Sequence, residues 1–430
     1  MSSAYLQCIE ASCGRTQDPR KDSHACSYCG GLLEVRYEFE QIDPEKLRTM
    51  WHQRRLSGEP IDRSGVWRFR ELIPFTEPGH RIISLSEGST PLIGTRRTGW
   101  WAGPVHLTIK HQGNNPTGSF KDLGMTACIT RAEARGVRLV ACASTGNTSA
   151  SMAAYAARAG MKSLLFVPYR QISAAKLAQA FDYGALVVEV GDTFDEAFRL
   201  LREVAPELNL YLVNSLNPFR IEGQKTIVAE LLEQRAWRPP DYIVCPGGNL
   251  GNSSAIGKGL RELKELGLIE KIPKVVVVQA AGSSPFYEMM ASGADVLKPF
   301  AKPNTQATAI RIGDPANWKK AKRVLEWTGG MCEAVTDEEI LEAKAMLAED
   351  GVGCEPASAA TVAGVRKLVR AGKIPWHADI VCVLTGTQLK DTEYIMRHRA
   401  ESAESPQRLR LEPDLATLRK SLEAFLGATV

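Results

Sequence analysis

The chain has 430 residues, 44% of them hydrophobic, so it is long enough to bury two or three domain cores without stabilising disulfide bonds. Its 53 basic and 49 acidic residues are scattered along the whole sequence and leave a net charge of only +4, which argues against a nucleic-acid partner. No apolar run approaches the roughly 18 to 20 residues of a membrane span, and residues 1–22 are too polar for a secretory signal, so we expect a cytoplasmic protein with no membrane partner.

The amino-terminal part of the chain is distinguished by two pairs of cysteines, Cys8 and Cys13, then Cys26 and Cys29. Two such pairs can offer four thiolates to a tetrahedral zinc ion, as in a zinc ribbon. The first spacing, C-x4-C, is looser than the usual C-x2-C, His24 is a spare ligand, and a metal-free degenerate ribbon is the alternative. We expect a zinc-ribbon-like module at 1–40, followed by a helical linker at 41–80.

From about residue 80 onward, strand and helix patterns alternate. Apolar, β-branched runs predict buried strands at 139–143, 164–168, 186–190, 210–213, 242–245, 275–279 and 380–384. Stretches of helical period lie between several of them, at 150–158, 174–183, 194–203 and 227–235. This alternation predicts an α/β protein with parallel sheets, whose ligands bind at the carboxyl ends of the strands. We expect a large domain (81–136 and 214–400), a small domain (137–213) and a helical tail (401–430).

The segment GNNPTGSFKDLGM at 113–125 places Lys121 at the start of a predicted helix. A proline and glycines form a loop before it, after the strand-like residues 105–110. The positive end of the helix dipole favours the neutral form of a lysine amine, and imine formation requires a neutral amine. Lys121 alone could be a solvated lysine after a turn, but together with the segments that follow it predicts a reactive amine.

Two further segments each follow a predicted strand and lead into a helix. ASTGNTSAS at 143–151 gathers polar side chains where backbone N–H groups lack partners, which indicates an anion or carboxylate pocket rather than a simple helix cap: Ser144, Thr145, Asn147, Thr148 and Ser149. PGGNLGNS at 246–253 has three glycines that let backbone amides converge on a phosphate. It lacks the lysine of a nucleotide P-loop and does not match GxGxxG, so it suits a single monoester phosphate. Read alone it could be a structural turn.

The segment VCVLTGTQLKD at 381–391 places Thr385 at the carboxyl end of a buried strand. A neutral hydroxyl in this position could face a ring nitrogen without forcing that nitrogen to stay protonated, as an aspartate would. A strand-ending Thr–Gly turn is the alternative when this segment is considered alone.

The joint order of seven motifs resembles the threonine synthases. These enzymes share the pyridoxal-phosphate fold type II, the tryptophan synthase β-like fold, with threonine dehydratase and the cysteine synthases. The motifs are SEGSTPL at 86–92, NPTGSFKD at 115–122, STGNTSAS at 144–151, NSLNPFRIEGQKT at 214–226, GGNLGN at 247–252, EPASAAT at 355–361 and TGTQLKD at 385–391. Amino-terminal ribbons similar to the one expected here occur in some threonine synthases.

The resemblance implies a pyridoxal-phosphate site and a substrate site. Lys121 would be the catalytic Schiff-base lysine, Asn147 would bond the 3′-oxygen of the ring, and Thr385 would face the pyridine nitrogen. The other cofactor-binding residues would be Phe120, Gly247, Gly248, Asn249, Leu250, Gly251 and Asn252. The phosphate of O-phosphohomoserine would be held by Asn214, Ser215 and Arg220, with Ser144 and Thr148 contributing and Ser89 completing the set of substrate-binding residues.

The implied activity is conversion of O-phospho-L-homoserine and water to L-threonine and phosphate, by an enzyme that is commonly a homodimer. Two departures from the family pattern lie close to the cofactor segments in sequence: Leu123 stands where arginine is common, and Thr387 and Gln388 stand where His or Asn and Gly are more usual. They leave open a cysteate synthase-like enzyme, a threonine or serine dehydratase-like lyase, and a non-catalytic relative that binds pyridoxal phosphate.

Overall fold

The structure is a computed structural model that describes residues 3–20, 24–40, 42–75, 79–144, 146–169, 174–400 and 414–427. The chain divides into two units, Met1–Lys390 and Asp391–Val430. Within the described residues, no helix combines the length and the apolar character needed to cross a membrane.

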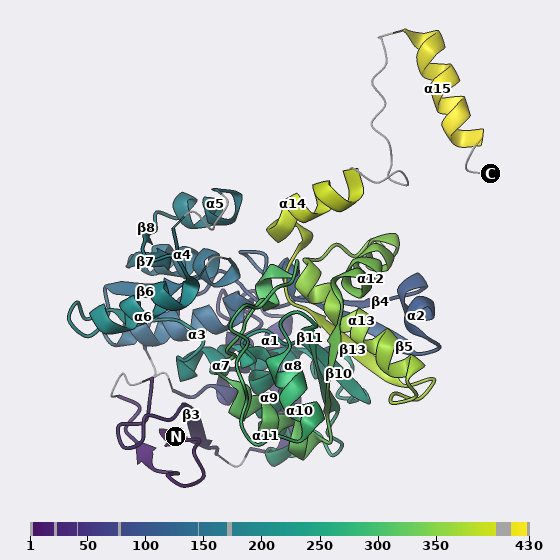
Figure 1. Cartoon of the computed structure of the whole chain (residues 1–430). Helices are drawn as coiled ribbons and strands as arrows, with labels where there is room; N and C mark the ends of the chain where they lie inside the picture. Colours follow the sequence, from purple (N-terminus) through teal and green to yellow (C-terminus); the bar gives the residue numbers. More distant parts are fainter. Residues whose placement is uncertain are drawn as a thin grey trace. The chain divides into compact units, whose positions relative to one another are not determined.

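The larger unit contains a six-stranded sheet in the order β12-β11-β10-β13-β5-β4 (Figure 1). All its neighbouring strands pair in parallel except β4, which runs antiparallel to β5. The strands are β4 (Leu92–Gly94), β5 (His106–His111), β10 (Tyr242–Pro246), β11 (Lys274–Ala280), β12 (Met331–Val335) and β13 (Asp379–Leu384).

A second sheet of the same unit has four strands, all parallel, in the order β8-β7-β6-β9. Its strands are β6 (Leu139–Ala143), β7 (Lys162–Val167), β8 (Leu186–Glu189) and β9 (Tyr211–Leu212). The strands expected from β-branched runs are therefore confirmed in both sheets, and the fold is the expected α/β class with two parallel sheets.

Helices cover both faces of the two sheets, which explains why central strands such as β6, β10 and β11 are continuous apolar runs rather than alternating ones. One face of the six-stranded sheet packs on α12 (Asp337–Glu349) and α13 (Pro356–Arg370), and these residues form one hydrophobic cluster. The opposite face packs on α1 (Pro44–Arg55), α8 (Thr226–Gln234), α9 (Gly251–Glu265), α10 (Pro285–Ser292) and α11 (Trp318–Thr328).

The four-stranded sheet is covered by helices from both sides in the same way. One face packs on α3 (Lys121–Ala134), α4 (Asn147–Ala159) and α5 (Ala174–Asp182), and the other on α6 (Phe194–Val204). The four helices expected at 150–158, 174–183, 194–203 and 227–235 are thus present as α4, α5, α6 and α8. Shorter helices are η1 (Trp67–Leu72), α2 (Arg97–Ala102), η2 (Gln112–Asn114), α7 (Pro218–Gln224) and η3 (Thr308–Ile310).

Helices α3 and α7 cross at two glycines, and this crossing sets the geometry of the site described below. A Cβ atom on Gly223 would overlap the carbonyl oxygen of Leu123. A Cβ atom on Gly124 would lie 2.8 Å from the carbonyl oxygen of Arg220. The two backbones can approach this closely only because neither residue has a side chain.

The amino-terminal module is a three-stranded antiparallel sheet in the order β2-β1-β3, formed by β1 (Ser3–Cys8), β2 (Thr16–Gln17) and β3 (Leu33–Glu38). Its apolar side chains, including Leu6 and Val35, share a hydrophobic cluster with Leu123 of α3 and Phe219 of α7. The module therefore packs directly on the two crossing helices.

The smaller unit, Asp391–Val430, contains α14 (Thr392–Ile395), a π-helical turn (Met396–Ala400) and α15 (Leu415–Gly427). Of the helical tail expected at 401–430, residues 401–413 and 428–430 lie outside the described residues.

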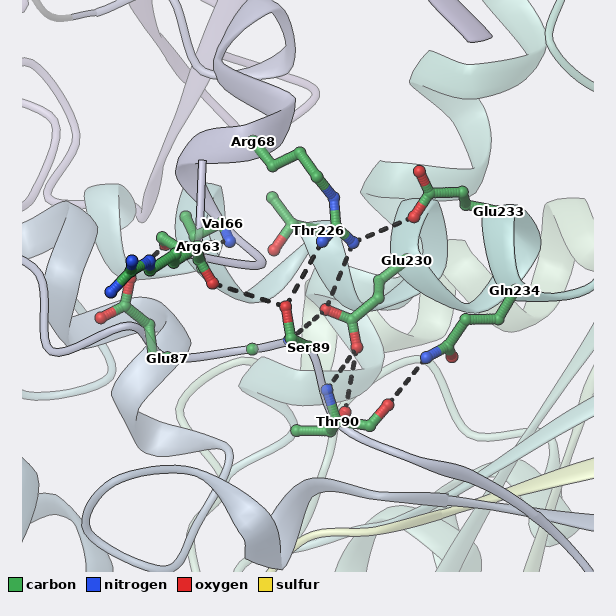
Figure 2. A network of polar contacts seen from close by, with 12 residues as sticks. Arg63, Val66, Arg68, Glu87, Ser89, Thr90, Thr226, Glu230, Glu233 and Gln234 are labelled. Carbon is green, nitrogen blue, oxygen red and sulfur yellow. Dashed lines mark hydrogen bonds and ion pairs between the residues drawn. The ribbon is translucent and has the colours of Figure 1, made fainter. Parts of the chain in front are cut away.

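A buried ion cluster fixes the segment that contains Ser89 and Thr90 (Figure 2). Glu230 of α8 accepts hydrogen bonds from the backbone N–H groups of Ser89 (2.6 Å) and Thr90 (2.9 Å), and it forms an ion pair with the fully buried Lys110. Arg68 lies 3.9 Å from the same carboxylate. Burial alone would raise the pKa of Glu230, but these two cations lower it, so the carboxylate is charged.

Replacing Glu230 with glutamine should destabilise the protein by roughly 3 to 5 kcal/mol, because the charge of Lys110 would remain buried with only neutral hydrogen-bond partners, Thr90 and Gln234. Thermal unfolding followed by circular dichroism measures the effect. The matched control is Glu203→Gln, since Glu203 is 60% exposed and its ion pair with Arg199 lies at the surface. Equal melting temperatures for the two variants would contradict a stabilising role for the buried cluster.

Candidate active site

Lys121 is the first residue of α3 and follows the loop at 113–120. The loop is held against the end of β13, because Phe120 N–H donates to the carbonyl oxygen of Thr385 (2.9 Å) and Thr387 N–H donates to that of Gly118 (3.0 Å). The Lys121 ammonium lies 4.1 Å from the centre of the Phe120 ring. The predicted lysine thus sits at a helix N-terminus beside the carboxyl end of a central strand.

The surroundings of Lys121 favour the neutral form of its amine. Its pKa is lowered from 10.5 to about 7, chiefly because the side chain is withdrawn from water and in part because of the positive charge of Arg220. The carboxylate of Glu355 acts in the opposite direction. Near neutral pH, a large fraction of this amine is therefore available as a nucleophile or base.

Asp122 anchors the residue next to Lys121. Its carboxylate accepts hydrogen bonds from the hydroxyls of Thr117 and Ser151, each at 2.6 Å, and from Thr117 N–H at 2.7 Å. Ser151 belongs to α4, so this buried carboxylate connects the lysine loop to the helix that begins at Asn147.

Asn147, Thr385 and Glu355 form a polar cluster. The Asn147 Nδ2 donates to both carboxylate oxygens of Glu355 (3.0 and 3.3 Å), and the Thr385 hydroxyl donates to one of them (3.2 Å). Thr385 also contacts the Ser358 hydroxyl at 3.0 Å. The structure thus brings together Asn147 and Thr385, which are 238 residues apart in the sequence.

Glu355 is a site residue to which the sequence analysis gave no role, although its motif EPASAAT was recognised. It is 4% exposed, and burial raises the pKa of its carboxyl group, while Asn147 and Lys390 oppose that shift. The sequence feature that could have indicated this role is the position of Glu355 directly before α13 and directly after a buried cysteine.

The glycine segment after β10 has the geometry of an anion loop. Leu250 adopts a left-handed conformation (φ 61°) and leads into α9, whose first N–H groups lack intrahelical partners. The side-chain amide of Asn252, in the first turn of α9, is buried and neither its nitrogen nor its oxygen has a hydrogen-bond partner. A buried amide without partners costs free energy unless a ligand satisfies it.

Close packing explains two of the glycines in this segment. A Cβ atom on Gly247 would lie 2.6 Å from Val277 Cγ1, and one on Gly248 would lie 3.1 Å from the carbonyl oxygen of Ala309. Asn249 has a structural role here, since its amide donates to the Ser215 hydroxyl (2.5 Å) and accepts from Ala316 N–H (2.6 Å).

The helix α7 carries Arg220 into the same region. Asn217 caps this helix by accepting from Phe219 N–H (3.0 Å), and Pro218 is its first residue, a position that suits proline. The Arg220 side chain is 2% exposed. Its Nη1 donates to the carbonyl oxygen of Val213 (3.2 Å), whereas Nε and Nη2 are buried without partners.

The other residues expected to bind substrate phosphate have mixed environments. Both side-chain atoms of Asn214 bond the backbone of Ala143, at 2.9 and 3.2 Å, so this amide joins the ends of β9 and β6. Ser144 and Thr148 are half-buried at the start of α4. Thr145 lies outside the described residues.

Ser89 occupies the ion cluster of Figure 2. Its hydroxyl accepts from Arg68 (3.3 Å) and donates to the carbonyl oxygen of Arg63 (3.5 Å), as Figure 2 shows. These contacts give Ser89 protein partners of its own, and its assignment as a substrate-binding residue stays a prediction.

The three residues that depart from the family pattern have different surroundings. Leu123 is 2% exposed and packs in the cluster that α3 shares with the amino-terminal module, so an apolar side chain fits there. Thr387 is half-buried and contributes its backbone N–H to the lysine loop, while Gln388 is exposed. Among the residues that the structure describes, none of these three side chains forms a hydrogen bond with Lys121, Asn147 or Thr385.

The four cysteines of the amino-terminal module form a candidate metal centre. Their sulfur atoms all lie within 4.8 Å of one another, with Cys8 and Cys29 at 3.4 Å and Cys13 and Cys26 at 3.8 Å. Four thiolates bound to one zinc ion at about 2.3 Å would be separated by about 3.8 Å. His24 is stacked edge-on against Tyr211 instead of joining the cluster.

A family model described as pyridoxal-phosphate dependent enzyme matches residues 83–386. The chain belongs to this family of enzymes. Among solved structures, maize serine racemase superimposes with a TM-score of 0.61 at 19% identity, covering 91% of this chain and 99% of that chain. A fungal L-serine ammonia-lyase from Rhizomucor miehei gives 0.62 at 23% identity, covering 72% and 97%. These structures show the shared fold.

Sequence relatives define the branch of the family. A threonine synthase of Methanocaldococcus jannaschii is 43% identical over 97% of this chain and 99% of that protein. A threonine synthase of Methanosarcina acetivorans is 44% identical over 91% of this chain and 93% of that protein. Within the pyridoxal-phosphate dependent enzymes, the chain is therefore a member of the threonine synthase family.

The residues present fit the cofactor of this family. Pyridoxal phosphate requires a neutral lysine amine, an anion loop and polar groups for its ring. Lys121, the glycine segment with the unpartnered Asn252, and the buried, unpartnered hydroxyl of Ser119 supply groups of these kinds. The protein itself leaves these groups unsatisfied.

The lowered pKa of Lys121 predicts the pH dependence of cofactor attachment. In protein freed of cofactor, the rate of covalent attachment should rise about tenfold per pH unit below the pKa and level off above about pH 7, because only the neutral amine reacts. The yellow absorbance of the attached cofactor reports the rate, and N-acetyl-lysine amide is the control with an ordinary amine. A rate that kept rising beyond about pH 9 would contradict the shift.

Proposed function

We propose that the chain is a threonine synthase that converts O-phospho-L-homoserine and water to L-threonine and phosphate, with pyridoxal phosphate held as a Schiff base on Lys121. One observation carries this proposal. The amine of Lys121 has a lowered pKa, and it lies near the buried guanidinium of Arg220, which has two N–H donors without partners. A dehydratase acting on free threonine has no phosphate to bind and no use for such a cation.

The cofactor would be held by residues from four segments of the chain. Lys121 would bind it covalently, the glycine segment and the start of α9 would bind its phosphate, and Asn147 and Thr385 would contact its ring. The proposed set is Phe120, Lys121, Asn147, Gly247, Gly248, Asn249, Leu250, Gly251, Asn252 and Thr385. When bound, the cofactor supplies an electron sink for the electron pair that proton removal leaves on the substrate.

Lys121 would act as the base once the substrate has displaced it. Its amine is neutral at pH values above about 7, so it can accept the proton of the substrate α-carbon at Nζ. The same Nζ can return a proton later in the reaction. Glu355 would position the site, because its carboxylate holds the amide of Asn147 and the hydroxyl of Thr385.

Arg220 would bind the phosphate of the substrate and retain it as it leaves. Its free Nε and Nη2 form a fork suited to two oxygens of a dianion, and burial strengthens the attraction. Asn214, Ser215, Ser144 and Thr148 would line the same pocket from the ends of β9 and the start of α4, and Ser89 is proposed as a further substrate contact.

A substrate panel tests the activity. The proposal predicts that O-phosphohomoserine yields phosphate and threonine in equal amounts. Ammonia from threonine or serine as the main product would favour the dehydratase alternative, and sulfite-dependent phosphate release from O-phosphoserine would favour the cysteate synthase alternative. Absence of turnover on all four substrates, in protein that binds pyridoxal phosphate, would favour a non-catalytic relative.

Replacing Arg220 with methionine should raise KM for O-phosphohomoserine roughly 10- to 100-fold, because each charge-assisted hydrogen bond contributes about 1.5 to 3 kcal/mol. The yellow colour of the bound cofactor should persist in this variant. Steady-state kinetics gives the result, with Arg199→Met as the control because Arg199 is exposed on α6. An unchanged KM would show that Arg220 does not bind the substrate.

A separate proposal concerns the four cysteines, which we infer hold one structural zinc ion. Four sulfur atoms at nearly tetrahedral spacing support it, together with the two turns that carry them: Cys13 N–H and Gly14 N–H donate to the Glu10 carbonyl oxygen, and Gly30 N–H donates to that of Cys26. A bound ion would cross-link β1 to the turn that precedes β3.

Elemental analysis of the purified protein should find one zinc per chain. Cys13→Ser should lower the zinc content and the melting temperature, because a structural ion stabilises only the folded module. Cys332→Ser is the matched control, since Cys332 lies in β12 and outside the cluster. Retention of one zinc in the Cys13 variant would refute the assignment.

The homodimer and the cytoplasmic location expected from the sequence stay predictions. Gel filtration with light scattering decides the first, and localisation of the chain in its own cells decides the second.

A further inference from the structure

A small cavity lies where the amino-terminal module meets helices α7, α9 and α11. Its volume is about 60 Å³. Six charged side chains contribute to its lining, together with mainly apolar groups: Glu34, Glu222, Lys258, Arg261, Lys320 and Arg323. The cavity is separate from the proposed active site, although Glu222 and Arg220 belong to the same short helix.

Most charges near the cavity are already paired. Lys258 forms ion pairs with Glu222 and with Glu262 (3.6 Å), and the buried Lys225 pairs with the same two carboxylates at 2.6 Å each. Two lysines therefore balance two glutamates.

The remaining acid, Glu34 of β3, is also occupied. Arg261 pairs with it at 3.0 Å. The surrounding cations lower the pKa of Glu34 to about 2, against the effect of burial, so its carboxylate stays charged.

Two cations that line the cavity are left without a carboxylate. Lys320 donates to the carbonyl oxygen of Leu33 (2.8 Å), and Arg323 donates to that of Ile9. Among the residues that the structure describes, no carboxylate lies within ion-pair distance of either side chain. Both come from α11, three residues apart, so they lie on the same face of the helix.

Two further observations indicate an unsatisfied site. The Nε of Arg261 is buried without a hydrogen-bond partner, and the nearest carboxylate in an ion pair with it is that of Glu265 at 3.7 Å. Burial, with repulsion from Lys258 and Arg323, lowers the pKa of Lys320 to about 8 although Glu34 and Glu222 attract its charge. Lys320 is half-buried and Arg323 is exposed, so an anion from solvent can reach both, and it would offset the repulsion between the neighbouring cations.

We propose that this cavity binds a small tetrahedral oxyanion of the phosphate class, held by Lys320, Arg323 and Arg261. Two unpaired positive charges match a dianion. A cavity of about 60 Å³ has room for one phosphate or sulfate ion.

The position of the cavity gives this anion a defined effect. It would cross-link α11 and α9 to the module through the partners of Lys320 and Arg323, the carbonyl oxygens of Leu33 and Ile9. It would thereby stabilise the module against α7, the helix that carries Arg220. The inference does not depend on the proposed reaction, since it concerns a different set of residues.

Calorimetric titration of the full-length holoprotein with inorganic phosphate tests the proposal. The titration uses an Arg220→Met background, so that the proposed substrate site does not contribute. We expect one phosphate per chain in this background. Adding Lys320→Met or Arg323→Met should weaken its binding roughly 10- to 100-fold, as expected for loss of a charge-assisted hydrogen bond.

The matched control is Lys322→Met in the same background. Lys322 belongs to the same helix but pairs with the exposed Asp295 and does not line the cavity, so its removal should leave the affinity unchanged. Phosphate should also raise the melting temperature of the background protein, and sulfate should compete. The proposal is overturned if the Arg220→Met protein binds no phosphate, or if the Lys320 and Arg323 variants bind it as tightly as the Lys322 variant.

Discussion

The crossing of α3 and α7 brings two cationic side chains, Lys121 and Arg220, into one region that is poor in water. Gly124 and Gly223 permit the approach, because any side chain at either position would meet the backbone of the other helix. Burial lowers the pKa of Lys121 most, and the positive charge of Arg220 lowers it further, while the guanidinium of Arg220 remains charged. The packing of α3 on α7 therefore places the neutral base, Lys121, near the permanent cation, Arg220.

Such an arrangement raises the free energy of the folded protein unless ligands bind to it. Arg220 keeps two buried donors without partners, and the amide of Asn252 and the hydroxyl of Ser119 are in the same condition. Groups of this kind cost free energy in the ligand-free protein and regain it on binding. Their types, an arginine fork, an amide and a hydroxyl, suit ligands with anionic oxygens. The carboxylates of Asp122 and Glu230 hold the neighbouring loops in place through their hydrogen bonds.

Much of this could be predicted from the sequence, because the motifs that contain Lys121, Asn147, Asn252 and Thr385 each follow a buried strand. Parallel strands end at the same edge of a sheet, so Lys121, Asn147, Asn252 and Thr385 were expected to converge. The domain boundaries stay a prediction.

Contacts between side chains could be predicted from the sequence less well than the strands and the motifs. Glu355 acquires its role from contacts with residues 208 and 30 positions away, which no local pattern encodes. Leu123 was treated as a departure near the cofactor, yet it packs against the amino-terminal module, because its helix has two buried faces. Ser89 was assigned with its motif, and its contacts with Arg68 and Arg63 depend on residues 21 and 26 positions earlier in the chain.

The amino-terminal module is more than an appended ribbon. Its apolar residues share a cluster with α3 and α7, and its strand β3 supplies Glu34 to the charges around α9 and α11. The module therefore contacts the helices that carry both Lys121 and Arg220. A metal ion at its four cysteines and an anion in the cavity would both act on the same junction.

The most direct test of the central claim is chemical labelling of the holoprotein. Borohydride reduction followed by peptide mapping should place a single pyridoxyl group on Lys121. A label on another buried lysine, such as Lys110 or Lys390, or no label at all, would contradict the account.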